Sequence, residues 1–444
     1  MLKTFPKGGV HPAEGKYSAN SAIEILPLPT TVSIPIAQHI GAPSKPIVEK
    51  GDKVKVGDKI AESTGFVSAN IHSSVSGTVS KIENVLDSSG YKRSCIVIDV
   101  EGDDWNESID RSTDLKKEIS LTDKEIINKI NDSGIVGLGG ATFPSHVKLS
   151  VPDGKKIDVL IINGVECEPY LTSDHRLMLE KAEEMLVGVQ ILMKALSVNI
   201  ALIGIENNKP DAIIHLKNLV KDYPGIEVHA LKVQYPQGGE KQLIKALINR
   251  EVPSGGLPLN VGAVVHNVGT AYAVYEAVQK NKPLFERVVT LTGKSVKKPS
   301  NFMVRIGTPV ANLVEAAGGL PEDTGKIING GPMMGKAINS LEVPVVKGTS
   351  GILIMPQELA KRKQENNCIR CAKCVSVCPQ GLEPYLLSKL ARLEKNDKLE
   401  NGGVMDCIEC GSCAYTCPAG LPLLDYIRLG KSRVSQIIRS RKQQ

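Results

Sequence analysis

Eight of the ten cysteines in this chain lie between positions 368 and 417, in two copies of one spacing. The copies read CIRCAKCVSVCP (368–379) and CIECGSCAYTCP (407–418). Each has the pattern C-x2-C-x2-C-x3-C-P, in which three close thiolates hold three corners of one [4Fe–4S] cubane and the fourth cysteine ligates the other cluster. The spacing therefore predicts a segment that carries two [4Fe–4S] clusters.

The exchange of the fourth ligand assigns the eight cysteines to two sites. We predict that the first cluster site consists of Cys368, Cys371, Cys374 and Cys417. The second cluster site then consists of Cys407, Cys410, Cys413 and Cys378. Zinc also binds paired C-x2-C sequences, but a tetrahedral site needs only four ligands and uses neither the third close cysteine nor the C-P ending. Two clusters alone only relay single electrons, so another part of the chain must define the substrate.

Composition describes an ordinary soluble globular chain, with 41% hydrophobic and 23% charged residues. At 444 residues it should hold three or more compact units. There is no apolar run of about 18 residues and no secretory signal at the start, so we expect a cytoplasmic protein that partner subunits hold peripherally at a membrane. Ten cysteines in such a protein indicate metal binding rather than disulfides. Aromatic residues make up only 4% and form no stacking platform among basic residues, which argues against nucleic-acid binding.

Basic residues gather after the last cysteine motif. They are either a solvated helix end or a docking surface for an acidic partner or an anionic membrane face, and the pattern leaves both readings open. The residues are Arg428, Lys431, Arg433, Arg439, Arg441 and Lys442.

Short apolar runs separated by Gly, Pro and charged turns predict β-hairpins between residues 30 and 100. This region resembles a barrel-sandwich domain of the biotinyl/lipoyl kind, which carries a modifiable lysine at a hairpin tip. No lysine occurs between Lys59 and Lys81. We therefore expect a structural or docking domain rather than a covalent carrier.

Strand and helix signals alternate between about 120 and 285, which predicts an α/β unit with a largely parallel sheet. Residues 157–166 and 199–206 have the apolar runs of buried strands, residues 177–196 have helical periodicity, and Thr122 is a candidate N-cap for the helix that follows. The chain is thus a multidomain α/β protein. Its predicted units are an N-terminal barrel-sandwich domain (1–105), an α/β domain (115–285), a small β-rich module (286–345) and a helical two-cluster domain with a basic tail (355–444).

Two glycine-rich segments qualify as phosphate-binding candidates. Residues 134–148, GIVGLGGATFPSHVK, can bring backbone N–H groups close to a phosphate, although by composition alone the segment might be an ordinary turn. It lacks the dinucleotide fingerprint, because Thr142 stands at the third glycine and the loop follows a helix. The segment GGPMMGK (330–336) fits the spacing of a nucleotidase loop, but Ala337 replaces the required Ser or Thr, and Pro332 removes an N–H.

GLGGATFPSHVK, followed by INGVECEPYLTSDHR (162–176), resembles the flavin-binding subunit of NADH:quinone oxidoreductase, as do YPQGGEKQLI (235–244) and VVHNVGTAYAV (264–274). FPKGGVHPAEGK (5–16) and GGPMMGKAI (330–338) narrow the resemblance to the RnfC family of the Rnf electron transport complexes, over nearly the whole chain. Those complexes are membrane-bound ferredoxin–NAD oxidoreductases coupled to ion transport. The resemblance implies a Rossmann-like flavin domain and a β-grasp module of the soluble-ligand-binding (SLBB) kind before the cluster domain.

The resemblance also implies which residues bind FMN and NAD(H). Gly137, Gly139 and Gly140 would line the flavin, and Phe143 would stack on the nicotinamide side. Lys148, Asn267 and Thr270 would hold the flavin phosphate. Asn163 and Glu166 would contact the flavin, Glu168 the nucleotide, and Gly238 and Glu240 the isoalloxazine. Those relatives have Arg, Asp and Glu where this chain has Leu138, Val165 and Gly239. By pattern alone, Asn163, Glu166 and Glu168 are polar residues that end a strand, and Asp174 and His175 are surface or capping residues.

The implied activity is that of an electron-input subunit, a ferredoxin–NAD oxidoreductase or NADH dehydrogenase component. Hydride would pass between NAD(H) and FMN, and electrons would continue singly through the clusters, so no catalytic acid–base side chain is expected. Other Rnf subunits would move the coupling ion and connect the chain indirectly to ferredoxin. The alternatives are a soluble NADH dehydrogenase or electron-bifurcating flavin subunit, and a flavin-free iron–sulfur subunit for relay, assembly or docking.

Overall fold

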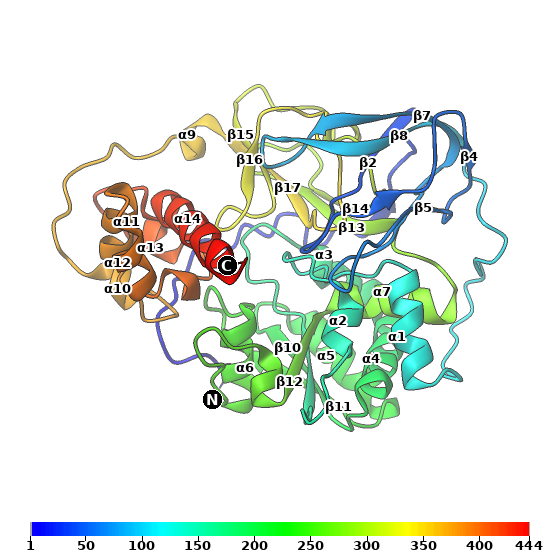
Figure 1. Cartoon of the computed structure of the whole chain (residues 1–444), viewed down its shortest axis with the longest axis horizontal. Coiled ribbons are helices and arrows are strands. Elements are labelled where there is room, and N and C mark those ends of the chain that lie inside the picture. Colours follow the sequence, from blue (N-terminus) through cyan, green and yellow to red (C-terminus); the bar gives the residue numbers. More distant parts are fainter. Residues whose placement is uncertain (1, 444) are drawn as a thin grey trace.

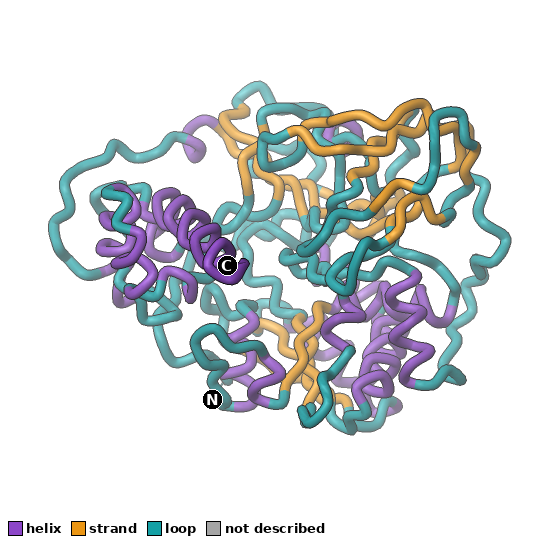
Figure 2. The backbone as a smooth tube through the Cα atoms, in the orientation of Figure 1, coloured by secondary structure: helices purple, strands orange, loops and turns teal. Residues whose placement is uncertain are grey.

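The computed structural model describes residues 2–443, with side chains as far as Arg441. Along the chain it contains a β-sandwich, an α/β domain, a mixed β-sheet and a helical module. Figure 1 shows the helical module at one end of the molecule, beside the other units, and Figure 2 shows the long loop that leads into it. The predicted multidomain α/β fold is confirmed.

The α/β domain is built on a parallel sheet with the strand order β11-β10-β9-β12. Along the central strand β9, Leu160 and Ile162 face one hydrophobic core, while Val159 and Ile161 face another. Both faces of the sheet are therefore covered, which explains the continuous apolar runs. The strands are β9 (Val159–Asn163), β10 (Ala201–Glu206), β11 (Ile226–Leu231) and β12 (Ala263–Asn267).

The helices of this domain begin and end close to their sequence signals. Thr122 is the N-cap of the first helix and forms a capping box with Glu125, as its position predicts. The helix expected over 177–196 is interrupted at Lys181, where the backbone leaves helical geometry (φ −129°). The helices are α1 (Asp123–Asp132), α2 (Ser145–Leu149), α3 (Ser173–Glu180), α4 (Ala182–Leu196), α5 (Pro210–Leu219), α6 (Glu240–Ile248) and α7 (Val268–Gln279). The side chains of α6 pack against one face of the sheet, and those of α1, α4, α5 and α7 belong to the core on the other.

The β-sandwich consists of a four-stranded and a three-stranded sheet, in the orders β2-β8-β7-β4 and β3-β5-β6. The segment in which carrier domains place their lysine is buried against the α/β domain: Asn70 Nδ2 donates to Asp132 O (3.3 Å), and His146 Nε2 contacts Phe66 O (2.9 Å). This packing agrees with a structural or docking role. The strands are β2 (Thr31–Pro35), β3 (Lys45–Pro46), β4 (Lys53–Val54), β5 (Lys59–Glu62), β6 (Ile71–His72), β7 (Ser76–Leu86) and β8 (Lys92–Gly102).

The mixed sheet has the order β1-β14-β13-β17-β15-β16 and draws on distant parts of the chain. Strand β1 (Ile23–Ile25) comes from the region assigned by sequence to the sandwich, and β17 (Gly351–Pro356) follows the predicted module end at 345. The other elements are β13 (Glu286–Thr292), β14 (Ser300–Arg305), α8 (Val310–Ala316), β15 (Thr324–Asn329) and β16 (Lys336–Ile338).

The helical module contains α10 (Lys373–Ser376), α11 (Pro384–Arg392), α12 (Asn396–Asn401), α13 (Ser412–Thr416) and α14 (Leu423–Gln443). The short helix α9 (Gln357–Ala360) precedes the exposed loop that enters it. The module has its own hydrophobic core, in which Leu387, Leu399 and Ile427 pack with Cys413 and Cys417.

Residues 3–17 form a segment that we call the N-terminal strap. It pairs with the α/β domain rather than with the sandwich, through bridges from Lys3 to Leu231 and from Val10 to Tyr235. In Figure 1 this blue segment runs from the N-terminus past the helical module.

Lys347 joins three units in the interior. Its side chain is almost fully buried, and Nζ donates to Asn70 O (2.8 Å) in the sandwich and Gly134 O (2.7 Å) in the α/β domain. Burial lowers the pKa of Lys347 to about 7. A neutral amine has two N–H groups, which is the number of carbonyls that it meets.

We expect Lys347→Met to remove a pH dependence of stability. Between pH 7 and 10.5 the folded protein holds Lys347 neutral while the unfolded chain still binds the proton, so this residue makes the unfolding free energy rise with pH. Chemical denaturation at pH 7 and pH 9 should show this contribution, about 2 kcal/mol, in the wild type and not in the variant. The exposed Lys50→Met is the control and should keep the wild-type dependence. Equal dependence in Lys347→Met would contradict the assignment.

Candidate functional site

Loops at the carboxyl edge of the parallel sheet bring the predicted flavin residues together. The glycine loop (137–143) lies against the first turn of α7, where Leu138 N donates to Thr270 Oγ1 (2.9 Å). Asn267, at the end of β12, caps α7 by accepting from Gly269 N (2.8 Å). The edge of a parallel sheet next to a helix N-terminus favours the phosphate of a nucleotide.

The predicted glycines have different roles in this loop. A Cβ added to Gly139 would lie 3.2 Å from Asn267 Cβ, so Gly139 permits the close approach of α7. Gly140 has φ +121°, and a Cβ added there would meet nothing within 4 Å. Gly137 N donates to Phe143 O (2.9 Å) and closes the loop. The backbone at Gly140 therefore borders open space, as a flavin cradle requires.

Four further predicted residues meet beside this loop. Lys148 Nζ, on α2, donates to Glu240 Oε1 (2.9 Å) and to Val265 O (3.0 Å). Asn163 Nδ2, at the end of β9, donates to Gly238 O (2.8 Å). The lysine assigned to the phosphate is thus held at the sheet edge, and the Gly238–Glu240 turn is tied to β9.

Glu166 and Glu168 spend their carboxylates on the chain itself. Glu166 has φ +47° and accepts from Asp174 N (2.8 Å) and His175 N (3.2 Å) at the start of α3. Glu168 accepts from Met333 N (3.2 Å) and Met334 N (2.7 Å). Burial raises the pKa of Glu168 to about 7. The segment 330–336, rejected above as a nucleotidase loop, therefore closes over the residue that the resemblance assigns to the nucleotide.

The prediction that Asp174 and His175 are surface or capping residues is wrong. Asp174 accepts from Asn267 Nδ2 (2.7 Å), and burial, with Glu166 nearby, raises the pKa of Asp174 to about 7. His175 is buried, and its Nε2 lies 2.9 Å from Asp211 Oδ1. Both lie beneath the site, and their place in the LTSDHR segment beside the motif was the available signal.

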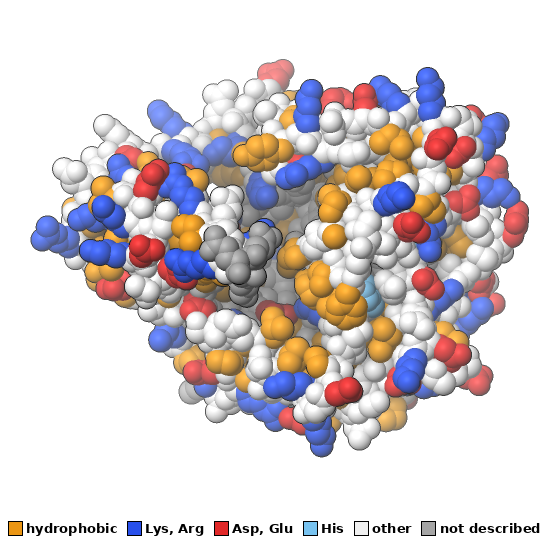
Figure 3. Space-filling model, in the orientation of Figure 1, with side chains coloured by type: hydrophobic (Ala, Val, Ile, Leu, Met, Phe, Trp, Pro, Cys, Tyr) orange, Lys and Arg blue, Asp and Glu red, His pale blue; other side chains and the backbone are white. Residues whose placement is uncertain are grey.

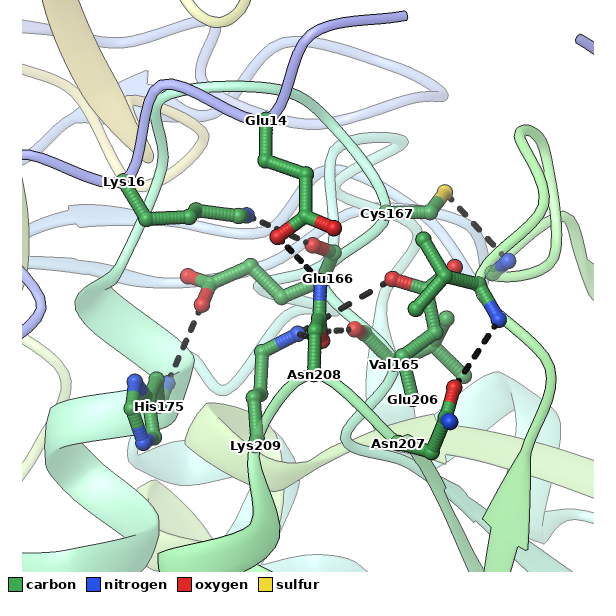
Figure 4. A network of polar contacts seen from close by, with 12 residues as sticks. Glu14, Lys16, Val165, Glu166, Cys167, His175, Glu206, Asn207, Asn208 and Lys209 are labelled. Atoms are coloured by element: carbon green, nitrogen blue, oxygen red, sulfur yellow. Dashed lines mark hydrogen bonds and ion pairs between the residues drawn. The ribbon is translucent and has the colours of Figure 1, made fainter. Parts of the chain in front are cut away.

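Sequence reasoning also missed Lys16, Lys209 and Cys167, which Figure 4 shows gathered around the loop after β9. Lys209 Nζ donates to Val165 O (2.8 Å), and Gly238 N donates to Cys167 Sγ (3.3 Å). No local pattern marks these residues, because their partners lie elsewhere in the chain.

The four cysteines of the second cluster site line one cavity. Cys378, Cys407, Cys410 and Cys413 surround it, together with Leu382, Leu424 and Ile427. Burial raises the pKa of the Cys413 thiol to about 12, with Cys410 and Cys407 as the next causes, so these thiols are close neighbours. Cys378 comes from the first motif, as the exchanged ligand assignment predicts. Across the described residues, no three His, Cys, Asp or Glu side chains converge as ligands of a single ion, whereas a thiol-lined cavity suits a larger cluster.

The first cluster site is more exposed. Cys368 and Cys371 lie in the exposed loop, while Cys374 and Cys417 are neighbours in the module interior. The two motifs share left-handed backbone at matching positions: Arg370 (φ +57°) matches Glu409 (φ +58°), and Ala372 (φ +56°) matches Gly411 (φ +79°). The repeat in the sequence is therefore also a repeat in loop conformation.

The second cluster site faces the flavin edge. Tyr235 O–H, beside the Gly238 turn, donates to Cys410 O (2.8 Å), and Cys410 packs with Val10, Tyr235 and Met333. Cys167, which accepts from Gly238 N, lies against the same cluster of side chains. In Figure 3 this face of the molecule is hollowed between the helical module and the larger units.

Gly411→Val should loosen this docking. An added Cβ would lie 2.7 Å from Met333 O, and φ +79° is unfavourable for a β-branched residue. We expect NADH to reduce the clusters at least tenfold more slowly in stopped-flow absorbance, with iron content retained. The control is Gly90→Val, at a left-handed turn of the sandwich where an added Cβ meets nothing within 4 Å. Unchanged reduction in Gly411→Val would contradict the docking geometry.

Most of the basic residues after the last motif are paired within the chain. Arg428 and Lys431 contact Glu409, Arg433 contacts Glu394, and Arg441 contacts Glu400. Arg439 has no such partner among the described residues, and the side chain of Lys442 lies outside them. Pairing of this kind favours the helix-end reading over a docking surface. None of the helices in the described part of the chain has the length and apolar character needed to cross a bilayer.

Family models match four successive regions. They are the RnfC barrel sandwich hybrid domain (residues 3–103), the Nuo51 FMN-binding domain (130–276), the SLBB domain (288–337) and the 4Fe-4S dicluster domain (360–418). Their order agrees with the units of the structure.

Relatives match over nearly the full length. The chain is 50% identical to the RnfC protein of the proton-translocating ferredoxin:NAD(+) oxidoreductase complex of Clostridium ljungdahlii, over 97% of this chain and 94% of that protein. It is 45% identical to the Na(+)-translocating counterpart of Acetobacterium woodii (96% of both) and 42% identical to the corresponding protein of the ion-translocating oxidoreductase complex of Rhodobacter capsulatus (100% and 86%). A solved NAD+-reducing [NiFe]-hydrogenase shares the fold, with a TM-score of 0.50 and 17% identity over 70% of this chain and 63% of that one.

Proposed function

Because this chain belongs to the RnfC family of the ion-translocating ferredoxin:NAD(+) oxidoreductases, we propose that it is the subunit that exchanges electrons with NAD(H). Two [4Fe–4S] clusters and FMN are its cofactors. The observation that carries the proposal is the docking of the second cluster site against the flavin edge, through Tyr235 and Cys410.

The residues at the sheet edge fit FMN. Gly140 presents its backbone to open space, and α7 offers a helix N-terminus beside it. Lys148 places an ammonium group near that terminus, and its ion pair with Glu240 holds it there. A cationic side chain next to backbone N–H groups is a phosphate site. Asn163 and Gly238 would then border the ring system.

FMN, when bound, accepts hydride from NADH and releases the electrons one at a time. The chain's own part is to position, enclose and connect. Phe143, on the open side of the loop, would stack against the nicotinamide. Glu168 and the 330–336 segment would border the nucleotide and exclude water. This arrangement needs no catalytic acid or base.

The contacts give the cluster sites an order. The second cluster site touches residues beside the Gly238 turn, and the first cluster site lies toward the exposed loop. Electrons would therefore pass between the flavin edge and the second site, then the first, and then a partner subunit. We propose that partner subunits hold the chain at the cytoplasmic face of the membrane and move the ion.

Anaerobic purification tests the proposal. We expect about eight irons and about eight sulfides per chain, with one FMN released by acid. NADH should bleach the flavin and then reduce both clusters. Zinc in place of iron, or protein that refuses FMN, would refute it. A full iron count without flavin would leave the flavin-free relay subunit.

A further inference from the structure

The N-terminal strap touches both halves of the proposed redox site. At its middle, Gly9 N donates to Val377 O (2.9 Å), and Gly8 packs so closely on Cys378 that an added Cβ would lie 2.6 Å from the Cys378 carbonyl carbon. Val10 pairs with Tyr235 in both directions (2.8 and 2.9 Å). The strap thus runs between a ligand of the second cluster site and the turn that borders the flavin.

At its end, the strap places Lys16 beneath the loop after β9 (Figure 4). Lys16 Nζ donates to Glu166 O (2.9 Å), Glu168 O (2.9 Å) and Leu171 O (2.7 Å). The ammonium group has three N–H groups, and each meets one carbonyl. Tyr170 N also donates to Glu14 O (2.7 Å), so the strap grips the loop twice.

This loop needs external support. Between Gly164 and Leu171 it has no helix or strand, and two non-glycine residues are left-handed, Glu166 (φ +47°) and Tyr170 (φ +72°). Such backbone persists only where its surroundings hold it. Lys209 supplies one bond from the opposite side, to Val165 O, whereas Lys16 supplies three.

The charges around Lys16 keep it an ammonium at neutral pH. Burial, followed by the nearby Lys209, lowers the pKa of Lys16 to about 8, while Glu166 and Glu206 oppose that shift. No carboxylate lies within ion-pair distance of Lys16 in the described structure. Its partners are the three loop carbonyls, which points to a positioning role.

We propose that Lys16 is a positioning residue for the flavin and nucleotide loop, and that the strap holds this loop in register with the second cluster site. This inference rests on the proposed function for its ligand, but the contacts of Lys16 do not depend on it. The N-terminal segment then belongs to the redox site, although the sandwich follows it in the chain.

The test compares Lys16→Met, Lys16→Gln and Lys16→Arg in the full chain. The control is Lys3→Met, because Lys3 also donates to a carbonyl from the strap, Leu247 O, but away from the loop. Hydrogen exchange of the 164–171 amides is measured on FMN-free protein. FMN affinity is measured by quenching of flavin fluorescence, with iron counted in every sample.

We expect Lys16→Met and Lys16→Gln to speed exchange in the loop and weaken FMN binding about tenfold or more, since several hydrogen bonds to a charged group are lost. Lys16→Arg should recover part of both, and Lys3→Met should match the wild type. If Lys16→Met does not fold, the Gln and Arg variants decide. Wild-type exchange in those variants, or equal losses in Lys3→Met, would overturn the inference. A wild-type chain that binds no FMN would instead refute the proposed function, while loop exchange still tests Lys16.

Discussion

Cys378→Ser is expected to remove the cluster bound by Cys407, Cys410 and Cys413, although Cys378 lies in the other motif. The structure supports this result because Cys378 lines the same cavity as those three thiols. Anaerobically purified Cys378→Ser protein should lose about four of about eight irons. Electron paramagnetic resonance after dithionite reduction should lose the signal of one cluster. Because the second cluster site faces the flavin edge, NADH should no longer reduce the remaining cluster.

Cys417→Ser is the matched control, since Cys417 occupies the same place in the second motif. Cys374 and Cys417 are neighbours, so this variant should lose the first cluster site instead. It should also lose about four irons, but NADH should still reduce the cluster that remains. If Cys378→Ser instead keeps an NADH-reducible cluster and Cys417→Ser does not, the order of the two sites is reversed.

Lys148→Met is expected to release FMN. The substitution removes the cation assigned to the phosphate and leaves Glu240 without its partner at 2.9 Å. A hydrogen bond to a charged group is worth about 1.5–3 kcal/mol, so FMN should bind roughly 10- to 100-fold more weakly. Titration of apoprotein, followed by flavin fluorescence, measures the affinity directly.

Two variants interpret this result. Lys155→Met removes an exposed lysine from the nearby 152–156 turn and should bind FMN normally. Lys148→Arg keeps the charge and should retain most of the affinity. Iron content should not change in any of the three. Wild-type affinity in Lys148→Met would place the phosphate elsewhere.

Local patterns predicted much of this protein. The cysteine spacing was sufficient for the two cluster motifs, because three ligands of a cubane come from a few adjacent residues. The capping box at Thr122 and the apolar runs of β9 and β10 predicted elements that the structure contains. The likeness of the 134–148 and 162–176 segments to known flavin subunits indicated residues that the structure brings to one sheet edge.

Contacts between distant segments decided the rest. Asp174 gave no sign of burial in the sequence, because its partner Asn267 lies 93 positions away. The helix expected over 177–196 broke at Lys181, because α3 turns away to meet Glu166 at its start. The closure of the 330–336 segment over Glu168 depends on a separation of 165 residues or more.

The sequence by itself determined the ligands of the clusters, the order of the domains and the family. Each of these is encoded in short segments, whose chemistry does not depend on what lies beside them. Only the tertiary structure decided which cluster site faces the flavin edge and what Lys16 does, since its three carbonyl partners are 150 to 155 residues away. A lysine followed by a polar turn reads as solvent-exposed, and burial against backbone carbonyls arises only when the chain is folded.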